Sequence, residues 1–421
     1  MGFDTAVSGL RAASTNLNII GNNVANAGTT GFKSSRGDFA DVFASSGLAA
    51  NSNAIGQGVA LASVKQSFAQ GNISFTENSL DMAINGEGFF TLNDNGSLVY
   101  SRAGAFQVDR DGYVVNSSGQ RLVSYVTNSA GQSTGQTQDL QIDTSLIQPS
   151  ATVQADVLIN LDSREVVPTV AWGGPYDAFA APPTAPGPNE YNASTAITVY
   201  DSLGNPHVQT MFFVKTAVAN EWEVHTMIDG VTTSGPDTLT FDSSGNIPAA
   251  ALPAQVNIAG WVPLDASGAP NGASIQAMTL ELTGSTQFGS DFSVNRAVQD
   301  GFTTGQLRGV EVDDSGVVFA RFTNTQTRAL GQIVLTSFSN PGGLAPQGDT
   351  SWSETFASGQ PTLGIPGTAR VGVIQSGALE DSNVEVTEQL VDMIVAQRDF
   401  QANAQVIQTE DAITQTIINM R

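Results

Sequence analysis

The residues that come closest to metal-binding spacing are two aspartates followed by a glycine. Asp109 and Asp111 are separated by one residue and precede Gly112, a spacing that can open a calcium loop because hard cations take carboxylate oxygens. The further ligands that an EF-hand needs downstream are missing. The same residues suit a tight turn, in which Asp bonds its own backbone and Gly takes a positive φ. We therefore expect a hairpin turn here and no metal.

Residues for other chemistry are also sparse. The two histidines, His207 and His225, fall in segments that we expect to be strands, and the chain has no cysteine. Disulfides, thiolate zinc sites and cysteine nucleophiles are therefore excluded. Serine-hydrolase, zinc-protease and phosphate-loop motifs do not occur, and Gly86-Glu-Gly88 is too short for a dinucleotide fingerprint. We expect no catalytic residue and no cofactor, and hence no enzyme.

Charge and hydropathy limit the partners further. The 421 residues include 39 acidic and 16 basic ones, for a net charge of −23. Since nucleic acid is bound through Lys and Arg contacts to phosphate, we expect neither nucleic acid nor an anionic membrane surface as a partner. No run approaches the roughly 18 apolar residues of a membrane span. The N-terminus has neither the basic nor the apolar region of a secretory signal, which by itself would favour the cytosol.

The longest uninterrupted helical pattern covers residues 382–421. Ser382 and Glu385 have the S-x-x-E spacing of a capping box, and the residues that follow contain no Gly and no Pro. A seam with alternating steps of three and four, as in a coiled coil, comprises Leu390, Met393, Gln397, Phe400, Ala404 and Ile407. A second apolar stripe comprises Val391, Val395, Ala402, Val406, Ile413, Ile417 and Met420. One partner helix cannot cover both stripes.

A matching helical pattern lies at the N-terminal end. Steps of four and three connect Phe3, Val7, Leu10, Ser14, Leu17, Gly21 and Val24. Each terminal segment alone could be an ordinary amphipathic helix on the surface of its own domain. Because only the two ends have long helical periodicity, we expect them to pair with each other. The second stripe that is left over then favours the subunit of a polymer.

Between the helices, short alternating segments and turn sequences such as Asn93–Gly96 predict β-structure. The expected fold is mainly β with long terminal α-helices, which pair as a coiled-coil-like domain, and with two nested β-domains. The expected divisions are 1–71 (N-terminal helix and extended linker), 72–145 (first half of the inner β-domain), 146–284 (inserted outer β-domain), 285–373 (second half of the inner β-domain) and 374–421 (C-terminal helix).

Several motifs of this chain resemble those of the bacterial flagellar rod and hook proteins. The N-terminal signature consists of Ser8-Gly-Leu-Arg-Ala-Ala-Ser14, Ile20-Gly-Asn-Asn-Val-Ala-Asn26 and Thr30-Gly-Phe-Lys33. Asp81-Met-Ala-Ile-Asn-Gly-Glu-Gly-Phe-Phe90 resembles the motif that opens the first β-domain of these proteins. The run from Val391 to Ala404 and the ending Ile417-Ile-Asn-Met-Arg421 are similar to the hook members of the family in particular.

The resemblance implies a structural function. It implies a subunit that self-assembles into the flagellar hook, a flexible curved tube and universal joint that passes torque from the rod to the filament. The paired helices would line the inner tube, and the β-domains would form outer layers. The location would be the hook, outside the cell, after export through the flagellar channel without cleavage. The implied partners are further copies of the chain, the distal rod, hook cap and hook–filament junction proteins, and the flagellar export apparatus.

For the self-assembly interface we predict the apolar residues Val7, Leu10, Leu17, Leu390, Ile394, Phe400 and Ile407. Phe39 and Phe43 form an F-x-x-x-F pair, which is either a local hydrophobic anchor or, by the resemblance, an export-recognition motif. A distal-rod or other axial protein is an alternative function, disfavoured by the large inserted domain. A secreted β-rich adhesin or binding module is an alternative of another class, but it would not need matched terminal helices.

Overall fold

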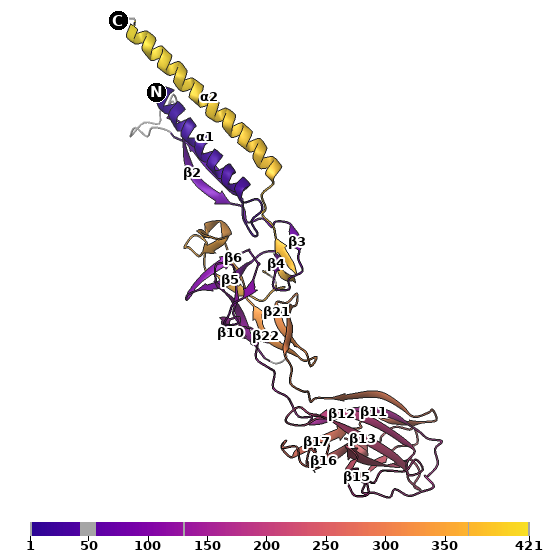
Figure 1. Ribbon diagram of the computed structural model, residues 1–421. Helices are drawn as coiled ribbons and strands as arrows, with labels where there is room; N and C mark the ends of the chain where they lie inside the picture. The colour runs from indigo at the N-terminus through magenta and orange to yellow at the C-terminus, as the bar shows by residue number, and fades with distance from the viewer. Residues whose placement is uncertain (1, 43–55, 129–130, 369, 420–421) are drawn as a thin grey trace. The chain divides into compact units, whose positions relative to one another are not determined.

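The structure, a computed structural model, describes residues 2–42, 56–128, 131–368 and 370–419 (Figure 1). It divides the chain into two compact units. The first comprises Met1–Thr144, Arg308–Arg321 and Thr327–Arg421, and the second comprises Ser145–Leu307 and Phe322–Gln326. Among the described residues, no helix is long and apolar enough to span a membrane.

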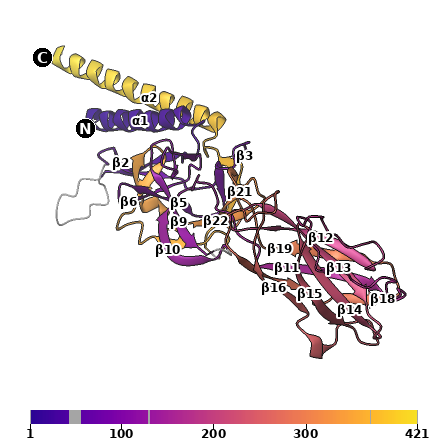
Figure 2. The same cartoon turned by 60° about the horizontal axis from the view of Figure 1, so that its bottom comes forward.

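The first unit contains two long helices, α1 (Gly2–Ala25) and α2 (Val386–Asn419). They lie side by side in both views (Figures 1 and 2), which confirms the predicted pairing of the chain ends. The 34 residues of α2 extend over about 51 Å at 1.5 Å per residue. α1 is followed by a turn in which Gly31 has a φ of +70°, a value that favours glycine.

α2 begins at Val386, later than the capping box predicted. The Ser382 hydroxyl accepts a hydrogen bond from the N–H of Val384 at 3.3 Å, within the segment that precedes the helix. The side chain of Asn383 accepts from the N–H of Ser34 at 2.7 Å and donates to the carbonyl of Ser67 at 2.8 Å. These long-range bonds hold the segment out of the helix, an effect that a local capping pattern cannot reveal.

Part of the predicted linker is a β-hairpin. β1 (Ser35–Asp41) and β2 (Val59–Gln66) pair antiparallel, and the N–H of Val59 donates to the Ser8 hydroxyl of α1 at 3.2 Å. A Cβ built on Gly37 would lie 3.1 Å from Cδ1 of Ile19, also on α1. The prediction of an extended connection was wrong for these residues, because α1 supplies the packing that their small side chains cannot provide among themselves.

The β-part of the first unit is built around a 13-stranded sheet whose main path is β20-β21-β22-β9-β5-β6-β25-β24. The strands of this sheet are β5 (Phe89–Asp94), β6 (Ser97–Ser101), β7 (Gln107–Val108), β8 (Val114–Val115), β9 (Arg121–Thr127), β10 (Ser133–Asp139), β20 (Leu307–Val312), β21 (Val317–Phe322), β22 (Thr327–Ile333), β23 (Leu335–Ser337), β24 (Ala345–Gly348), β25 (Ser351–Ser353) and β26 (Thr362–Gly364). The carboxylate of Asp109 accepts from the N–H groups of Asp111 and Tyr113 at 2.9 and 2.7 Å, which confirms the predicted turn.

Two further strand pairs connect residues that are distant in the sequence. β27 (Val373–Ser376) pairs with β4 (Met82–Asn85), and β28 (Ala378–Glu380) pairs with β3 (Ile73–Phe75). The predicted C-terminal division, 374–421, was therefore wrong at its start, because residues up to Glu380 are strands that complete the β-part of the first unit.

The second unit consists of two sheets around one core. One sheet has the order β16-β17-β11-β18, with β19 also paired to β11, and the other has the order β12-β13-β14-β15. The strands are β11 (Gln154–Asp162), β12 (Ala193–Tyr200), β13 (Pro206–Lys215), β14 (Glu221–Ile228), β15 (Val231–Thr240), β16 (Gln255–Trp261), β17 (Gln276–Glu281), β18 (Thr286–Phe288) and β19 (Ser293–Gln299). Buried residues of both sheets, including Val157, Phe213, Trp222 and Leu280, form the core between them, as in a sandwich.

The second unit ends later than predicted. The prediction placed its C-terminal boundary at residue 284, but β18 and β19 both pair with β11 and belong to this unit. Six of the seven residues of β19 are exposed, so the strand lacks the apolar alternation by which it could have been recognised.

Candidate assembly surface

The seam between α1 and α2 is formed by small residues on α1 and a mixed stripe on α2. Buried α1 residues recur every seven positions, at Ala6, Ala13 and Ile20. Gly9 lies so close to α2 that a Cβ on it would be 2.5 Å from Oδ1 of Asn403. Asn403 therefore lies on the side of α2 that faces α1. Residues that share this side by helical spacing are Gln389, Met393, Ala396, Phe400 and Ile407. The small α1 residues thus allow the two helices to approach closely.

α2 also has an apolar surface that α1 does not cover. Successive residues turn by about 100° around a helix, so the residues between the seam positions point to other sides. Six of these side chains have exposed fractions between 46% and 57%: Leu390, Val391, Ile394, Val395, Val406 and Ile413. We call these six residues the outer stripe of α2. Large apolar side chains exposed together on a helix that already has a partner indicate an interaction site.

The structure places the predicted interface residues in two environments. Phe400 and Ile407 are half-buried on the seam with α1, whereas Leu390 and Ile394 belong to the outer stripe. Val7, Leu10 and Leu17 are half-buried. The fully buried α1 residues Ala6 and Ala13 precede Val7 and Ser14 by one position. The predicted heptad period of α1 was therefore right. The side of α1 that faces α2, however, lies about one residue earlier in the sequence than predicted, because the small alanine side chains let the two helices approach more closely.

Of the predicted export pair, Phe39 lies in β1 and is 36% exposed. Phe43 lies outside the described residues. Phe39 also lines a hollow between α1, the β1–β2 hairpin and α2, together with Ile20, Lys65, Glu388 and Val395. This position fits a hydrophobic anchor, and it leaves the role in export as a prediction.

Below the helices, a buried ionic cluster connects three segments of the first unit. The Lys33 ammonium is 2.6 Å from one oxygen of Glu380, and the Arg102 guanidinium is 3.1 Å from the other. The side chains of Lys33 and Glu380 are completely buried. Burial lowers the pKa of the Lys33 ammonium, and the hydrogen bond to Glu380 opposes that shift. Glu380 is thus the one side chain that pairs with both of these buried basic groups.

The cluster explains the Thr30-Gly-Phe-Lys33 motif in physical terms. Lys33 also donates to the carbonyl of Ala69 at 2.8 Å, and the N–H of Gly71 donates to Glu380 at 2.9 Å. A Cβ on Gly31 would lie 2.4 Å from the backbone nitrogen of Ala103, so only glycine fits between these segments. The sequence analysis missed Glu380 because its partner Lys33 is 347 positions away, and no local pattern connects them.

Asn23 joins the same region to both helices. Its buried side chain accepts from the N–H of Ser35 at 2.9 Å and donates to the Ser35 carbonyl at 2.8 Å. It also donates to Oε1 of Gln389 on α2 at 2.9 Å. This asparagine of the N-terminal signature therefore fixes the end of α1, the start of β1 and the first turn of α2 together. We refer to this bond set and the ionic cluster as the junction.

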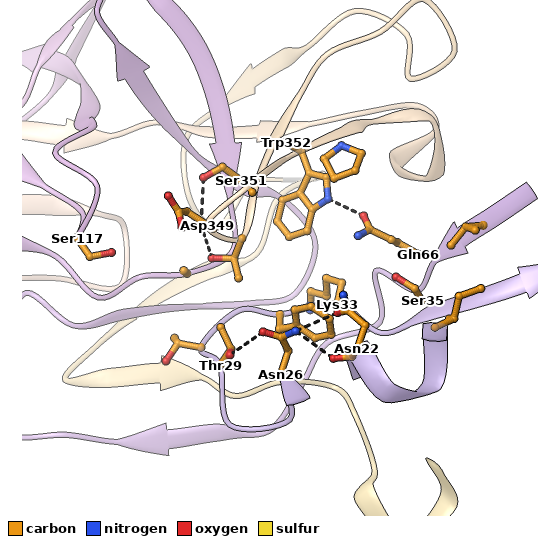
Figure 3. A pocket seen from close by; sticks show the side chains of 18 of the residues that line it. Asn22, Asn26, Thr29, Lys33, Ser35, Gln66, Ser117, Asp349, Ser351 and Trp352 are labelled. Atoms are coloured by element: carbon orange, nitrogen blue, oxygen red, sulfur yellow. Dashed lines mark hydrogen bonds between the residues drawn. The ribbon is translucent and has the colours of Figure 1, made fainter. Parts of the chain in front are cut away.

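A cavity of about 820 Å³ lies next to the junction, between the end of α1, β2 and the β24–β25 hairpin (Figure 3). The indole N–H of Trp352 donates to Oε1 of Gln66 at 2.6 Å across its wall. The amide of Asn26 donates to Oδ1 of Asn22 at 2.9 Å on the helix side. The lining is mixed and includes no arrangement of catalytic residues. Among the described residues, no group of three His, Asp or Glu side chains could hold a metal ion.

Both histidines are buried in the second unit. The ring of His207 is 2.5 Å from Asp229 and 3.4 Å from Asp201. Burial lowers the pKa of His207, but the two carboxylates outweigh burial and raise it above its usual value. His225 stacks on Trp172 at 4.2 Å, and burial lowers its pKa despite the nearby Glu223. Both residues have contacts typical of structural histidines.

Comparisons with known proteins cover most of the chain. Residues 3–33 match the family described as "Flagella basal body rod protein", and residues 83–158 match "Flagellar hook protein FlgE/F/G D1 domain". Residues 160–302 match "Flagellar basal body protein FlaE D2 domain", and residues 375–420 match "Flagellar basal body rod FlgEFG protein C-terminal". The four matches follow the order of the structural elements, from α1 through both β-regions to α2.

Relatives of full length are also similar. The chain is 39% identical to the flagellar hook protein FlgE of Escherichia coli and 38% identical to that of Salmonella typhimurium, over 100% of both chains in each case. It is 35% identical to the hook protein of Borreliella burgdorferi over 99% of this chain and 98% of the relative. The crystal structure of the Helicobacter pylori hook protein FlgE2 has a TM-score of 0.51 at 16% identity and covers 73% of this chain and all of its own, which supports the fold.

Paired terminal helices, an inserted β-unit and these matches together define a structural axial protein of the bacterial flagellum. More specifically, the chain belongs to the flagellar hook protein family. It is a subunit of the hook, which is part of the flagellum outside the cell and is attached to the basal body.

Proposed function

We propose that this hook subunit polymerises by packing the outer stripe of α2 against the terminal helices of neighbouring copies. The observation that carries the proposal is the exposure of six large apolar side chains along one helix that already has a partner. Burying each half-exposed side chain contributes about 1 kcal/mol, or about 6 kcal/mol per subunit before the cost of association. Since the contact repeats along a helical polymer, a modest gain per subunit suffices for a stable tube.

In this proposal the seam and the outer stripe have different tasks. Phe400 and Ile407 hold α2 on α1 within a subunit, whereas Leu390 and Ile394 contact a neighbour. Val7, Leu10 and Leu17 are half-exposed on α1 and complete the contact from the other side. The junction then fixes the helix pair to the β-part of the first unit through buried ionic and amide contacts. Torque applied to the helices would be passed on through these bonds.

The domain roles follow the same division. We propose that residues 1–71 and the α2 region form the inner tube, that 72–145 with the returning segment up to Glu380 form an inner β-domain, and that the second unit forms an outer β-domain. Tightly packed helices suit the transmission of torsion, and β-domains in looser polar contact suit bending of a universal joint. We further propose contacts at the two ends of the tube with distal rod, hook cap and hook–filament junction proteins, and export through the flagellar apparatus with Phe39 and Phe43 as a recognition pair.

Electron microscopy of the purified full chain under polymerising conditions tests the proposal. Wild type should form curved tubes, and Ile394→Asp should form none at concentrations 100-fold higher, because a buried unpaired carboxylate costs several kcal/mol. Val166→Asp is the matched control, since Val166 is 73% exposed in the second unit, and it should polymerise like wild type. Normal tubes from Ile394→Asp would contradict the role of the outer stripe.

A further inference from the structure

The ring of His207, near the start of β13, has a carboxylate oxygen at each of its two nitrogens. Nδ1 is 2.5 Å from Oδ2 of Asp229, and Nε2 is 3.4 Å from Oδ2 of Asp201. A neutral imidazole has a single N–H, whereas an imidazolium has two. Only the protonated ring can therefore donate to both carboxylates at once. A neutral ring must turn a lone pair towards one of them.

The surroundings of the ring make this difference matter. The charged groups that face it are Asp229, from the β14–β15 turn, and Asp201, from the β12–β13 turn. From the other sheet, the uncharged Trp261 of β16 packs edge-on against the ring, with the two centroids 5.0 Å apart. His207 is 5% exposed and Asp201 is completely buried. Little water therefore screens the charge of the ring from these carboxylates.

Loss of the proton would disturb the contact with Asp201 in particular. The contact with Asp229 is the shorter one, so we expect a neutral ring to keep its one N–H there. Burial raises the pKa of Asp201, but hydrogen bonds, those from Asn205 and Asn271 above all, outweigh burial and lower it to about 2. The lone pair of a neutral ring would then face a carboxylate that stays charged, which is a repulsive contact.

Asp201 connects two loops of the second unit. Its Oδ1 accepts from the N–H groups of Leu203 and Asn205 at 2.9 and 2.8 Å, which closes the β12–β13 turn. Its Oδ2 accepts from the side-chain amide of Asn271 at 2.7 Å, in the connection between β16 and β17. Repulsion at Asp201 therefore acts on both loops.

The β12–β13 turn also supports the two segments by which the chain enters and leaves the second unit. These connecting segments, 145–153 and 300–306, precede β11 and follow β19. A Cβ built on Gly204, in the turn, would lie 2.7 Å from Cβ of Pro149 and 3.2 Å from Cα of Thr303. The turn thus packs closely against both segments, and a change in the turn reaches them directly.

We infer that His207 is a proton-operated clasp, which holds the β12–β13 turn against the connecting segments while it is protonated and loosens the turn when it loses the proton. The carboxylates raise the pKa of His207 above its usual value of 6.5. The clasp is therefore closed below pH 6.5 and opens as the pH rises through the folded pKa. It gives the second unit a response to the pH of the medium outside the cell. It acts within one chain and does not depend on the outer stripe of α2.

Histidine-selective NMR of the isotopically labelled full chain tests the charge of the ring. The chain has two histidines, so the signal that is missing from His207→Gln belongs to His207. Its midpoint should lie above pH 6.5, whereas that of His225 should lie below. Asp229→Asn should lower the His207 midpoint by about 1–3 pH units, because it removes an opposite charge. A His207 midpoint at or below pH 6.5 would overturn the clasp.

Hydrogen exchange of backbone amides tests the opening, and a second turn of the same unit provides the control. The carboxylate of Asp242 accepts from the N–H groups of Ser244 and Asn246 at 2.8 and 3.0 Å. These bonds match those of the β12–β13 turn, but neither histidine bonds to Asp242. From one pH unit below the His207 midpoint to one unit above, Leu203 and Asn205 should exchange at least about threefold faster relative to Ser244 and Asn246.

The variant separates the clasp from a general effect of pH. In His207→Gln the exchange of the β12–β13 turn relative to the Asp242 turn should be the same at both pH values. A wild-type ratio that stays constant while NMR shows the loss of the proton would overturn the clasp. So would a change of equal size in His207→Gln. Both measurements use unpolymerised protein, so their failure would leave the proposed function standing.

Discussion

Glu380→Gln is the substitution whose effect can be worked out most directly from the structure. It removes the single anion between the two buried cations Lys33 and Arg102, at 2.6 and 3.1 Å, and keeps the shape of the side chain. An amide can accept a hydrogen bond from one cation, but it cannot neutralise either. Removing one partner of a buried ion pair typically costs about 3–5 kcal/mol, and we expect a loss in that range for the first unit.

The assay is urea unfolding followed by the fluorescence of Trp352, the one tryptophan of the first unit. To isolate its signal, the comparison is made in a background in which Trp172, Trp222 and Trp261 are replaced by Phe. Glu311→Gln is the matched control, because Glu311 pairs with Arg321 on the surface, with side chains 53% and 60% exposed. Exposed pairs contribute about 0–1 kcal/mol, so this control should change stability little.

The pH dependence gives a second readout of the same substitution. Burial already lowers the pKa of Lys33 below its usual 10.5, and loss of Glu380 should lower it further. The folded state then binds fewer protons than the unfolded state, so stability should rise as the pH increases towards 10.5. We expect this rise to be steeper in Glu380→Gln than in wild type. A loss no larger than that of Glu311→Gln, with an unchanged pH slope, would refute the assignment of the cluster as the joint between the helices and the β-part.

Three further predictions concern the second unit and assembly. The raised pKa of His207 means that its protonation stabilises the second unit below pH 6.5, and this stabilisation is lost as the pH rises through the folded pKa. His207→Gln should remove this pH-dependent contribution to stability. His225, whose pKa is lowered, is present in wild type and in His207→Gln, so the difference between their melting temperatures at each pH reports on His207 alone. The same dependence of melting temperature on pH in both proteins would contradict the ion pairs of His207. Limited proteolysis should cut α2 at least tenfold faster in monomer than in polymer, because assembly covers the outer stripe. Equal cleavage rates in monomer and polymer would argue that assembly does not cover this stripe. The second unit, 145–307, contains 15 acidic and three basic residues, and the Debye length falls from about 30 to about 8 Å as NaCl rises from 0.01 to 0.15 M. The critical concentration for polymerisation should therefore fall over this range of NaCl. A critical concentration that does not change with salt would place these charges away from the contacts.

The sequence predicted those features that depend on local periodicity and turn chemistry. The helical pattern at both ends, with no Gly or Pro after Ser382, was enough to predict two helices and their pairing. Pairs such as Asn95-Gly96, with φ of +51° and +98°, predicted the hairpin turns. These signals act within a few residues of the chain, and they were read correctly.

Features that depend on distant contacts were missed. No local pattern connects Lys33 with Glu380, and Asn383 leaves the helical conformation only because it bonds Ser34 and Ser67. The rotation of the α1 seam depends on how closely Ala6 and Gly9 let α2 approach. Helical periodicity gives the spacing of a stripe, but the contacts of the partner decide which side is buried.

The measurement that tests the central claim most directly is a density map of tubes polymerised from the purified chain, at a resolution that shows side chains. We predict that Val391, Val395, Val406 and Ile413 of each α2 pack against terminal helices of neighbouring copies, and that α1 and α2 of one chain keep the seam through Gly9. Tubes in which the outer stripe faces water, while only the β-units make contacts between subunits, would contradict the account.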